Sequence, residues 1–255
     1  MIASERKLYI LQQIHDRKII NLKDVARTLG TSEATIRRDL EKLEREGKLV
    51  RVQGGAALSE GTENLFDPGE LSMSAKERIR HREKSAVAAA ALAAVEVRDG
   101  QSIFLDCGTS VAPLADLLLG RRVHIVTYST LVLQRAKRPL ADLILVGGEY
   151  SAGHNMLTGS LAEKTLQNFH FDHAFIGCYG TSLQTGKCFQ RDMASTNMKW
   201  IGMEQADRKY LLIDDSKLEK NGLYSFCDMT AFDRIFCNEP AERPEAPEHF
   251  CWVKI

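Results

Sequence analysis

Apolar positions in the first sixty residues recur at helical spacing in three short segments. The three sets are Leu8, Leu11 and Ile14; Leu22, Val25, Ala26 and Leu29; and Ile36, Leu40 and Leu43. Asn21 precedes the second set as a helix cap, Gly30 follows it as a turn, and Thr31 or Ser32 caps the third. The pattern therefore predicts a helix, a tight turn and a further helix.

A small β-hairpin is predicted directly after these helices. Residues 49–52 are β-prone and lead through Gln53-Gly54-Gly55 into a second short apolar run. Arg51 and Lys48 lie at its base, where they are able to reach phosphates, and the two glycines allow a close approach of backbone to a ligand. Such a hairpin after a helix-turn-helix is typical of a wing.

From residue 101 onward, short apolar β-prone runs alternate with helical segments. The runs are 102–106, 123–128, 142–147, 173–178, 209–214, 233–238 and 249–255. This alternation predicts an α/β fold with a mostly parallel sheet and helices on its faces. Residues 59–74 are rich in Gly, Pro, Ser and acidic residues without any period, and predict a linker. We therefore expect a helix-turn-helix domain at 1–58 and an α/β domain at 75–255, which opens with one long helix over about 75–95.

The loops after the predicted strands are the candidate ligand site, because ligands bind at the carboxyl ends of parallel strands. Asp106-Cys107-Gly108-Thr109-Ser110 joins the first strand to a helix, and its hydroxyls and helix N-terminus suit an oxyanion. Thr and Ser are also ordinary helix caps, so this loop alone does not decide. The later strands are followed by polar loops that contain Ser129, Gly148, residues 177–180, and residues 214–217 with Lys217.

Charge is unevenly distributed along a chain whose net charge is zero. Residues 1–58 hold 12 Lys and Arg against 8 Asp and Glu, a net charge of +4, and the rest of the chain carries −4. The basic excess lies at the front, where a DNA backbone would be met. The sequence shows no apolar run long enough for a membrane span and no secretory signal, so we expect a cytoplasmic protein with no membrane partner. The six cysteines show no metal-site spacing and are interpreted as reduced and mostly buried.

The run TSEATIRRDLEKLEREGKLVRVQGGA resembles the DeoR family of bacterial regulators, and the loops of the α/β half resemble its sensor domain in the same order. The resemblance implies a sugar-phosphate-responsive repressor that binds an operator in double-stranded DNA as a homo-oligomer, without a cofactor. It implies a sensor fold similar to ribose-phosphate isomerase and glucosamine-phosphate deaminase. It places Ser32, Thr35, Arg37 and Arg38 on a recognition helix and Arg51, Gly54 and Gly55 on the wing. It places Asp106, Gly108, Thr109, Ser110, Ser129, Gly148 and Lys217 in the effector pocket.

Several alternatives stay open at this point. The arginines of the first domain are also compatible with a solvated surface, as are Arg78, Arg80, Arg82 and Lys84, which otherwise meet ligand phosphate or DNA. An enzyme acting on a sugar phosphate would use this fold too, but no carboxylate–histidine pairing or dedicated lysine motif is identifiable. A sensor that docks a protein is the third alternative. His170 and His173 beside Asp172 lack a matched third ligand and are not interpreted as a metal site.

Overall fold

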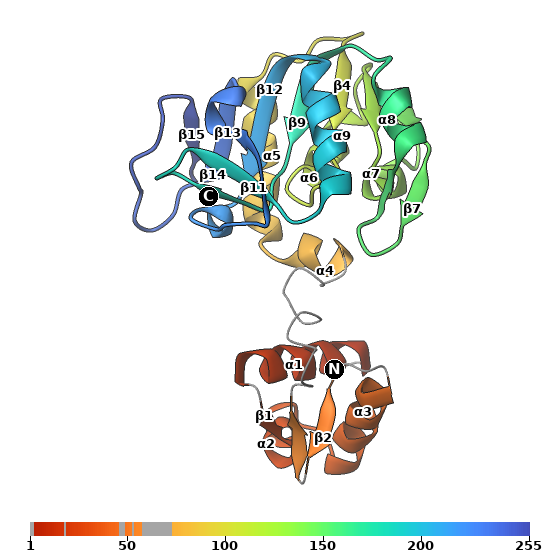
Figure 1. The fold of residues 1–255 in the computed structure, drawn as a ribbon, viewed down its shortest axis with the longest axis vertical. Coiled ribbons are helices and arrows are strands. Elements are labelled where there is room, and N and C mark those ends of the chain that lie inside the picture. The colour runs from red at the N-terminus through yellow and green to blue at the C-terminus, as the bar shows by residue number, and fades with distance from the viewer. Residues whose placement is uncertain (1–2, 18, 46–48, 53, 58–72) are drawn as a thin grey trace. The chain divides into compact units, whose positions relative to one another are not determined.

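The computed structural model describes residues 3–17, 19–45, 49–52, 54–57 and 73–255 (Figure 1). The chain divides into two compact units, Met1–Leu71 and Ser72–Ile255, which are described separately. Most of the predicted linker at 59–74 lies outside the described residues, as do Lys48 and Gln53 of the predicted wing.

The first unit has the predicted helix-turn-helix and wing. Its elements are α1 (Ala3–Arg17), β1 (Ile19–Asn21), α2 (Leu22–Thr28), α3 (Glu33–Arg45), β2 (Val50–Val52) and β3 (Gly55–Ala57). The strands form an antiparallel sheet in the order β1-β3-β2. The Asn21 side chain caps α2 by accepting from the Lys23 amide at 2.9 Å, as predicted, because this satisfies one of the free N–H groups at a helix start.

The core of this unit forms where α1 packs on α3. Ile36, Leu40 and Leu43 are all buried, which confirms the predicted inner face of α3. The predicted inner face of α1 is only partly right, because Leu8 is 46% exposed and the buried residues are Ile10 and Ile14. Residues four apart share a helix face, whereas Leu8 precedes Ile10 by two positions and so points to the other side of α1.

The second unit is built on a parallel sheet of seven strands within residues 73–255, all of which are described. In chain order the strands are β4 (Ser102–Leu105), β5 (His124–Thr127), β6 (Asp142–Leu145), β9 (Phe171–Ile176), β12 (Ala206–Ile213), β14 (Arg234–Asn238) and β15 (Phe250–Val253). Their order across the sheet is β15-β14-β12-β9-β4-β5-β6, so each predicted run forms a strand. The chain leaves β4 in one direction and returns to its other side at β9, so the topological switch point lies between β4 and β9.

Helices cover both faces of the sheet and enclose two separate cores (Figure 1). One face carries α5 (His81–Ala94), α6 (Ala112–Leu118) and α7 (Thr130–Arg135), and the other carries α8 (Ser160–Leu166) and α9 (Met193–Glu204). The smaller elements are the hairpin β7 (Glu149–Ser151) and β8 (Met156–Thr158), and the antiparallel sheet of β10 (Gly180–Ser182), β11 (Lys187–Gln190) and β13 (Tyr224–Asp228). Burial on both faces explains why the strands read as continuous apolar runs.

The predicted long helix over about 75–95 is wrong, because the structure has two helices there. The first, α4 (Met73–Arg78), ends two residues before α5 begins. Between them, Arg80 adopts a left-handed conformation with φ of 54° and precedes the first residue of α5. This conformation costs a non-glycine residue about 1–2 kcal/mol. It is accompanied by ion pairs of the Arg80 guanidinium with Asp214 and Asp215, which are too distant in the sequence for the helix propensity of this segment to reveal them.

None of the described helices is long and apolar enough to cross a membrane. The six cysteines are all free thiols, and Cys107, Cys178, Cys188 and Cys237 are buried.

The contact between α9 and β4 makes Gly202 sensitive to substitution. A Cβ at Gly202 would lie 2.2–2.6 Å from three atoms of the fully buried Phe104 ring. Alanine favours a helix over glycine by about 1 kcal/mol, but overpacking a core costs about 1–3 kcal/mol. We expect Gly202→Ala to lower the free energy of unfolding by about 1 kcal/mol or more in urea titrations. Gly120→Ala, where a Cβ meets nothing within 4 Å, is the control, and equal stability of both variants would contradict the close packing.

Candidate functional site

The start of α3 presents polar side chains in a fixed arrangement. Ser32 caps the helix by accepting from the Thr35 amide at 3.2 Å, and the two hydroxyl oxygens lie 2.9 Å apart. Ser32 is exposed and Thr35 is half-buried. The cap leaves both side chains at the outer end of the helix, where the unpaired N–H groups of the first turn favour an anion.

Arg37 and Arg38 lie on the exposed face of α3, and among the described residues no ion pair or hydrogen bond is recorded for either guanidinium. The next residue, Asp39, points inward, where its carboxylate receives Arg6 Nε at 2.8 Å. Both side chains of this ion pair are at most 15% exposed. The pair ties α1 to α3 and so sets which face of α3 is turned outward.

The predicted wing residues have different surroundings. Arg51 is ion-paired with Glu41 at 2.7 Å and Glu44 at 3.1 Å, both on α3. Gly54 lies at the exposed turn with φ of 80° and open space around it. Gly55 is buried, and a Cβ there would lie 1.9 Å from the Ile20 carbonyl oxygen, so glycine is required by the packing of β3 on β1. Contact of these residues with DNA stays a prediction.

Asp106 is the centre of the predicted ligand site in the second unit, and it is fully buried. Its carboxylate accepts from the Tyr128 hydroxyl at 2.5 Å and from the Gly177 amide at 2.9 Å. The same carboxylate forms an ion pair with Lys199 of α9, whose side chain is 3% exposed. Asp106 therefore holds the loops after β4, β5 and β9 and the helix α9 together at the switch point.

The buried partners of Asp106 have fixed protonation states. Burial and the adjacent carboxylate raise the pKa of Tyr128 well above its usual value, so its hydroxyl remains a donor. Burial, the largest single effect, lowers the pKa of Lys199, but the charge and hydrogen bond of Asp106 together with the neighbouring Cys107 and Cys178 outweigh it, and the net shift is upward. The Lys199 ammonium therefore stays charged at neutral pH.

The other predicted effector residues surround this centre. Gly108 and Gly177 approach closely, since a Cβ on Gly108 would lie 3.5 Å from the Gly177 Cα. Thr109 and Ser110 follow and are largely buried. Ser129 is also buried, and its hydroxyl oxygen has no recorded partner within the described part of the chain. Gly148, with φ of 157°, packs against Thr158, where a Cβ would lie 2.4 Å from the carbonyl oxygen.

Cationic side chains gather at the same edge of the sheet. Lys217, Lys220 and Arg191 all lie over the ring of Tyr179, with their cationic centres 4.3–5.8 Å from its centroid. Burial and the neighbouring Lys217 lower the pKa of Lys76, and burial, Lys217 and Arg191 lower that of Lys220. Burial is the larger cause for both lysines, and Lys217 adds to it, as expected where charges are poorly screened. The cation cluster, defined as Lys76, Lys84, Lys217, Lys220 and Arg191, therefore has the character of an anion site.

Lys84 is the most deeply buried member of the cation cluster, at 4% exposed. Its ammonium donates to the Lys76 carbonyl oxygen at 2.6 Å and to the Thr109 hydroxyl at 3.2 Å. Burial is the main cause that lowers its pKa to about 8, Asp214 opposes the shift and Lys217 adds to it. The open choice between a solvated face and a ligand contact is therefore settled against solvation for Lys84, whereas Arg78 and Arg82 are exposed.

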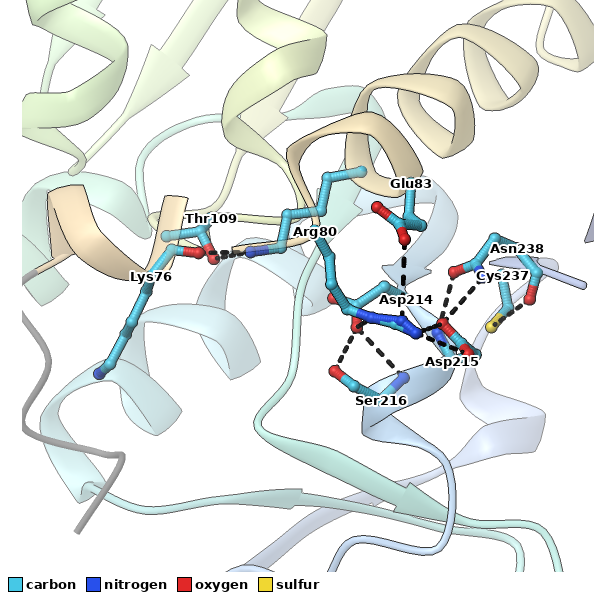
Figure 2. Close-up of polar contacts among 10 residues, drawn as sticks. Lys76, Arg80, Glu83, Thr109, Asp214, Asp215, Ser216, Cys237 and Asn238 are labelled. Carbon is cyan, nitrogen blue, oxygen red and sulfur yellow. Dashed lines mark hydrogen bonds and ion pairs between the residues drawn. The ribbon is translucent and has the colours of Figure 1, made fainter. Parts of the chain in front are cut away.

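Arg80 joins the α4–α5 junction to the loop after β12. Its terminal nitrogen lies 2.7 Å from Asp215, and its Nε lies 3.6 Å from Asp214 (Figure 2). Asp215 also accepts from the Asn238 amide at 2.8 Å, and Asp214 caps the short 3₁₀ turn Asp215–Lys217. The loop that carries Lys217 is thereby held against the start of α5.

A separate hollow lies at the opposite edge of the sheet, where the strands begin, and His173, Arg208, Asp233 and Arg234 contribute to its lining. Its cations are engaged locally, since Arg208 pairs with Asp233 at 2.7 Å and Arg234 donates to the Ala94 carbonyl at 3.2 Å. His173 lies 3.2 Å from Gln101, whereas His170 faces Asp207. The predicted ligand loops and the cation cluster lie at the other edge, which is where we place the candidate site.

Sequence reasoning missed several residues of the site. Lys199 was not identified, although a lysine in the otherwise apolar segment 198–203 is a signal for a buried charge that needs a partner. Tyr128 and Arg191 were not assigned roles either, because tyrosine after a strand and arginine in a loop have many ordinary uses. The Asp106 carboxylate, which the sequence places in the effector pocket, is instead engaged by Tyr128, the Gly177 amide and Lys199.

The first unit is a winged helix-turn-helix that exposes Arg37 and Arg38 on α3. In the same chain follows an α/β unit whose loops are lined by cations. Together these features define a DNA-binding regulator with a ligand-sensing domain. The DeoR-like helix-turn-helix domain matches residues 6–62, and the DeoR C terminal sensor domain matches residues 79–239. The chain therefore belongs to the DeoR family of transcriptional regulators, and it is a regulator, not an enzyme.

The names of similar proteins agree with this assignment. The lactose phosphotransferase system repressor of Streptococcus mutans is 29% identical over 90% of this chain and 90% of its own length. The L-fucose operon activator of Haemophilus influenzae is 29% identical over 95% of this chain and 94% of its own length. Ribose 5-phosphate isomerase A of Methanocaldococcus jannaschii is 21% identical over 53% of each chain, with a TM-score of 0.39, which is too low to carry an argument.

Removing the Lys199 ammonium should strongly destabilise the second unit. Lys199→Met leaves the buried Asp106 carboxylate without its cation, and breaking a buried ion pair in this way costs about 3–5 kcal/mol. We expect a clear fall in the thermal unfolding temperature, partly recovered when Asp106→Asn is added, because the uncompensated charge is then removed. Lys164→Met on the exposed side of α8 is the control. A Lys199→Met variant as stable as the wild type would show that Tyr128 and Gly177 suffice to hold the carboxylate.

Proposed function

We propose that this chain is a repressor of a carbohydrate or nucleoside catabolic operon and that a phosphorylated sugar releases it from its operator. The observation that carries the proposal is the cation cluster beside the predicted phosphate loop. Burial, with the charge of Lys217 adding to it, lowers the pKa of Lys76, Lys84 and Lys220, so their positive charges are disfavoured in the empty site, and a bound dianion would favour them. A phosphate group supplies this charge, and its oxygens accept from ammonium, guanidinium and hydroxyl groups.

The hydroxyl groups near the cation cluster favour a phosphorylated sugar over inorganic phosphate. Thr109, Ser110 and Ser129 lie on loops that meet at the switch point, and the Ser129 hydroxyl is buried without a recorded partner among the described residues. A buried hydroxyl without a partner costs free energy that a polar ligand recovers. The named relatives regulate lactose phosphotransferase and L-fucose operons, which supports a sugar-related effector here.

The proposed DNA contact uses the start of α3. Arg37 and Arg38 are exposed beside the Ser32 cap, and this end of the helix enters the major groove in helix-turn-helix proteins. A symmetric homo-oligomer would present two such helices to a palindromic or repeated operator. Release follows from linkage, because an effector that binds the DNA-incompetent arrangement more tightly shifts the population towards it.

Loss of either arginine should weaken DNA binding. We expect Arg37→Ala and Arg38→Ala to reduce affinity for the DNA site that the wild-type chain selects in vitro, measured by fluorescence anisotropy. If the lost contact is to phosphate, the slope of log affinity against log salt should fall by about 1. Arg98→Ala, which removes a 77% exposed guanidinium from the sensor unit, is the control. Unchanged affinity in both α3 variants would remove α3 as the recognition helix.

A phosphorylated sugar should stabilise the folded chain. We expect at least one of ribose 5-phosphate, 2-deoxyribose 5-phosphate and glucosamine 6-phosphate to raise the thermal unfolding temperature, since a ligand at 100 times its Kd adds about 2.7 kcal/mol. Lys217→Met should shrink the shift by removing one cation from the site, whereas Lys164→Met should not.

The stabilising compound should also lower the affinity for the selected DNA. Stabilisation without any change in DNA binding would retain the ligand site and overturn release as the mechanism. No stabilisation by any of the three sugar phosphates, or by inorganic phosphate, would overturn the anion site itself.

A further inference from the structure

Lys84 connects two parts of the sensor unit that lie apart in the sequence, helix α4 and the loop after β4. Its ammonium is shared between the Lys76 carbonyl oxygen in α4, at 2.6 Å, and the Thr109 hydroxyl in the predicted phosphate loop, at 3.2 Å. Both acceptors are neutral, and no carboxylate within ion-pair distance is recorded for Lys84 in the described residues. A buried ammonium held only by neutral oxygens is poorly compensated for the water that it lost.

The Lys76 carbonyl is one of the groups that α4 cannot satisfy by itself. The last four carbonyls of a helix have no intrahelical donor, and Lys76 is the third residue from the end of α4. Lys84 supplies that donor and places a positive charge near the C-terminal end of α4, where the helix dipole favours it. Lys84 is therefore one of the groups that hold α4 on the sensor unit, together with the ion pair between Glu77 and Arg135, and the same ammonium faces the phosphate loop.

The contact between Lys84 and α4 matters because of the place of α4 in the chain. Helix α4 starts at Met73 and is the first described element after the segment that leads from the DNA-binding unit. On its other side, the break at Arg80 is held by Asp214 and Asp215, next to the loop of Lys217. The α4–α5 junction is thus attached to both the β4 loop and the β12 loop, which are two sides of the proposed anion site.

We propose that Lys84 couples occupancy of the anion site to the docking of α4. An anion bound beside Thr109 offers charged oxygens to the ammonium, and the attraction between two opposite charges in a poorly screened site exceeds that between an ammonium and a neutral carbonyl oxygen. The ammonium then turns from the Lys76 carbonyl to the anion, and the last turn of α4 loses its buried donor. This inference rests on the proposed function, because it requires that a phosphate-bearing ligand occupies the site.

Hydrogen exchange of the full-length chain tests the coupling directly. The probes are ribose 5-phosphate and inorganic phosphate, each added until its thermal shift is saturated, and the readout is amide exchange in peptides covering residues 73–80. In the wild type we expect the ligand to speed exchange there by about tenfold, as for loss of one hydrogen bond to a charged group. Exchange in the sheet strands should slow or stay constant.

Two variants test whether the effect of the ligand on α4 passes through Lys84 or through other residues. In Lys84→Met, exchange over 73–80 should already be fast without ligand and should not rise further, and the thermal shift should be smaller. In Thr109→Val, which removes the Lys84 acceptor in the predicted phosphate loop, the thermal shift and the ligand-induced rise of exchange over 73–80 should both be smaller than in the wild type. Lys164→Met is the control and should behave as the wild type in every arm.

The outcomes distinguish the inference from the proposed function. A thermal shift without any change in exchange over 73–80 overturns the coupling and leaves the anion site intact. An equal rise of exchange in the wild type and in Lys84→Met also overturns it, because the signal then bypasses Lys84. Absence of a thermal shift with every sugar phosphate and with phosphate overturns the proposed function, and the coupling with it.

Discussion

The buried carboxylate of Asp106 is the interaction on which the sensor unit depends. It lies at the switch point between β4 and β9, where the chain connections lead away from the centre of the sheet in opposite directions. The loops there lie beyond the ends of the strands, where the backbone hydrogen bonds of the sheet do not hold them together. Tyr128, the Gly177 amide and Lys199 each bring one element to this carboxylate. Since an unpaired buried charge is costly, all three partners must be in place together, and the loops are fixed as a group.

The contrast between Lys199 and Lys84 separates structure from ligand binding. Lys199 is buried beside a carboxylate, and its pKa is raised, so its charge is fully compensated within the protein. Lys84 is almost as buried but is held by neutral oxygens, and its pKa is lowered to about 8. A compensated charge stabilises the fold, whereas a charge that the protein leaves undercompensated favours a ligand of opposite sign. The inner ion pair is therefore scaffold, and the cation cluster outside it is the candidate site.

The sequence predicted the features that depend on local pattern. The seven apolar runs form the seven parallel strands, and the caps and apolar faces of α2 and α3 form as expected. Both kinds of feature depend on the pattern of neighbouring residues, since a strand buried on both faces is continuously apolar and a helix has a regular apolar spacing. The features that it could not predict depend on distant partners. Arg80 breaks the expected long helix because of Asp214 and Asp215, which follow more than 130 residues later. Lys199 meets Asp106 across 93 residues, and no local pattern reports that pairing.

The electrostatics of the helix-turn-helix unit explain why Arg51 and the α3 arginines have different surroundings. Glu41 and Glu44 lie on the same helix as Arg37 and Arg38, and two free carboxylates there would repel a phosphate backbone. Arg51 pairs with both glutamates, so the single positive charge of the wing offsets part of their charge instead of adding a free cation. Arg37 and Arg38, one to two turns earlier on α3, are exposed and place two positive charges near the start of the helix. The wing thus acts first on α3, and the positive potential at the start of that helix depends on the strand that packs against its end.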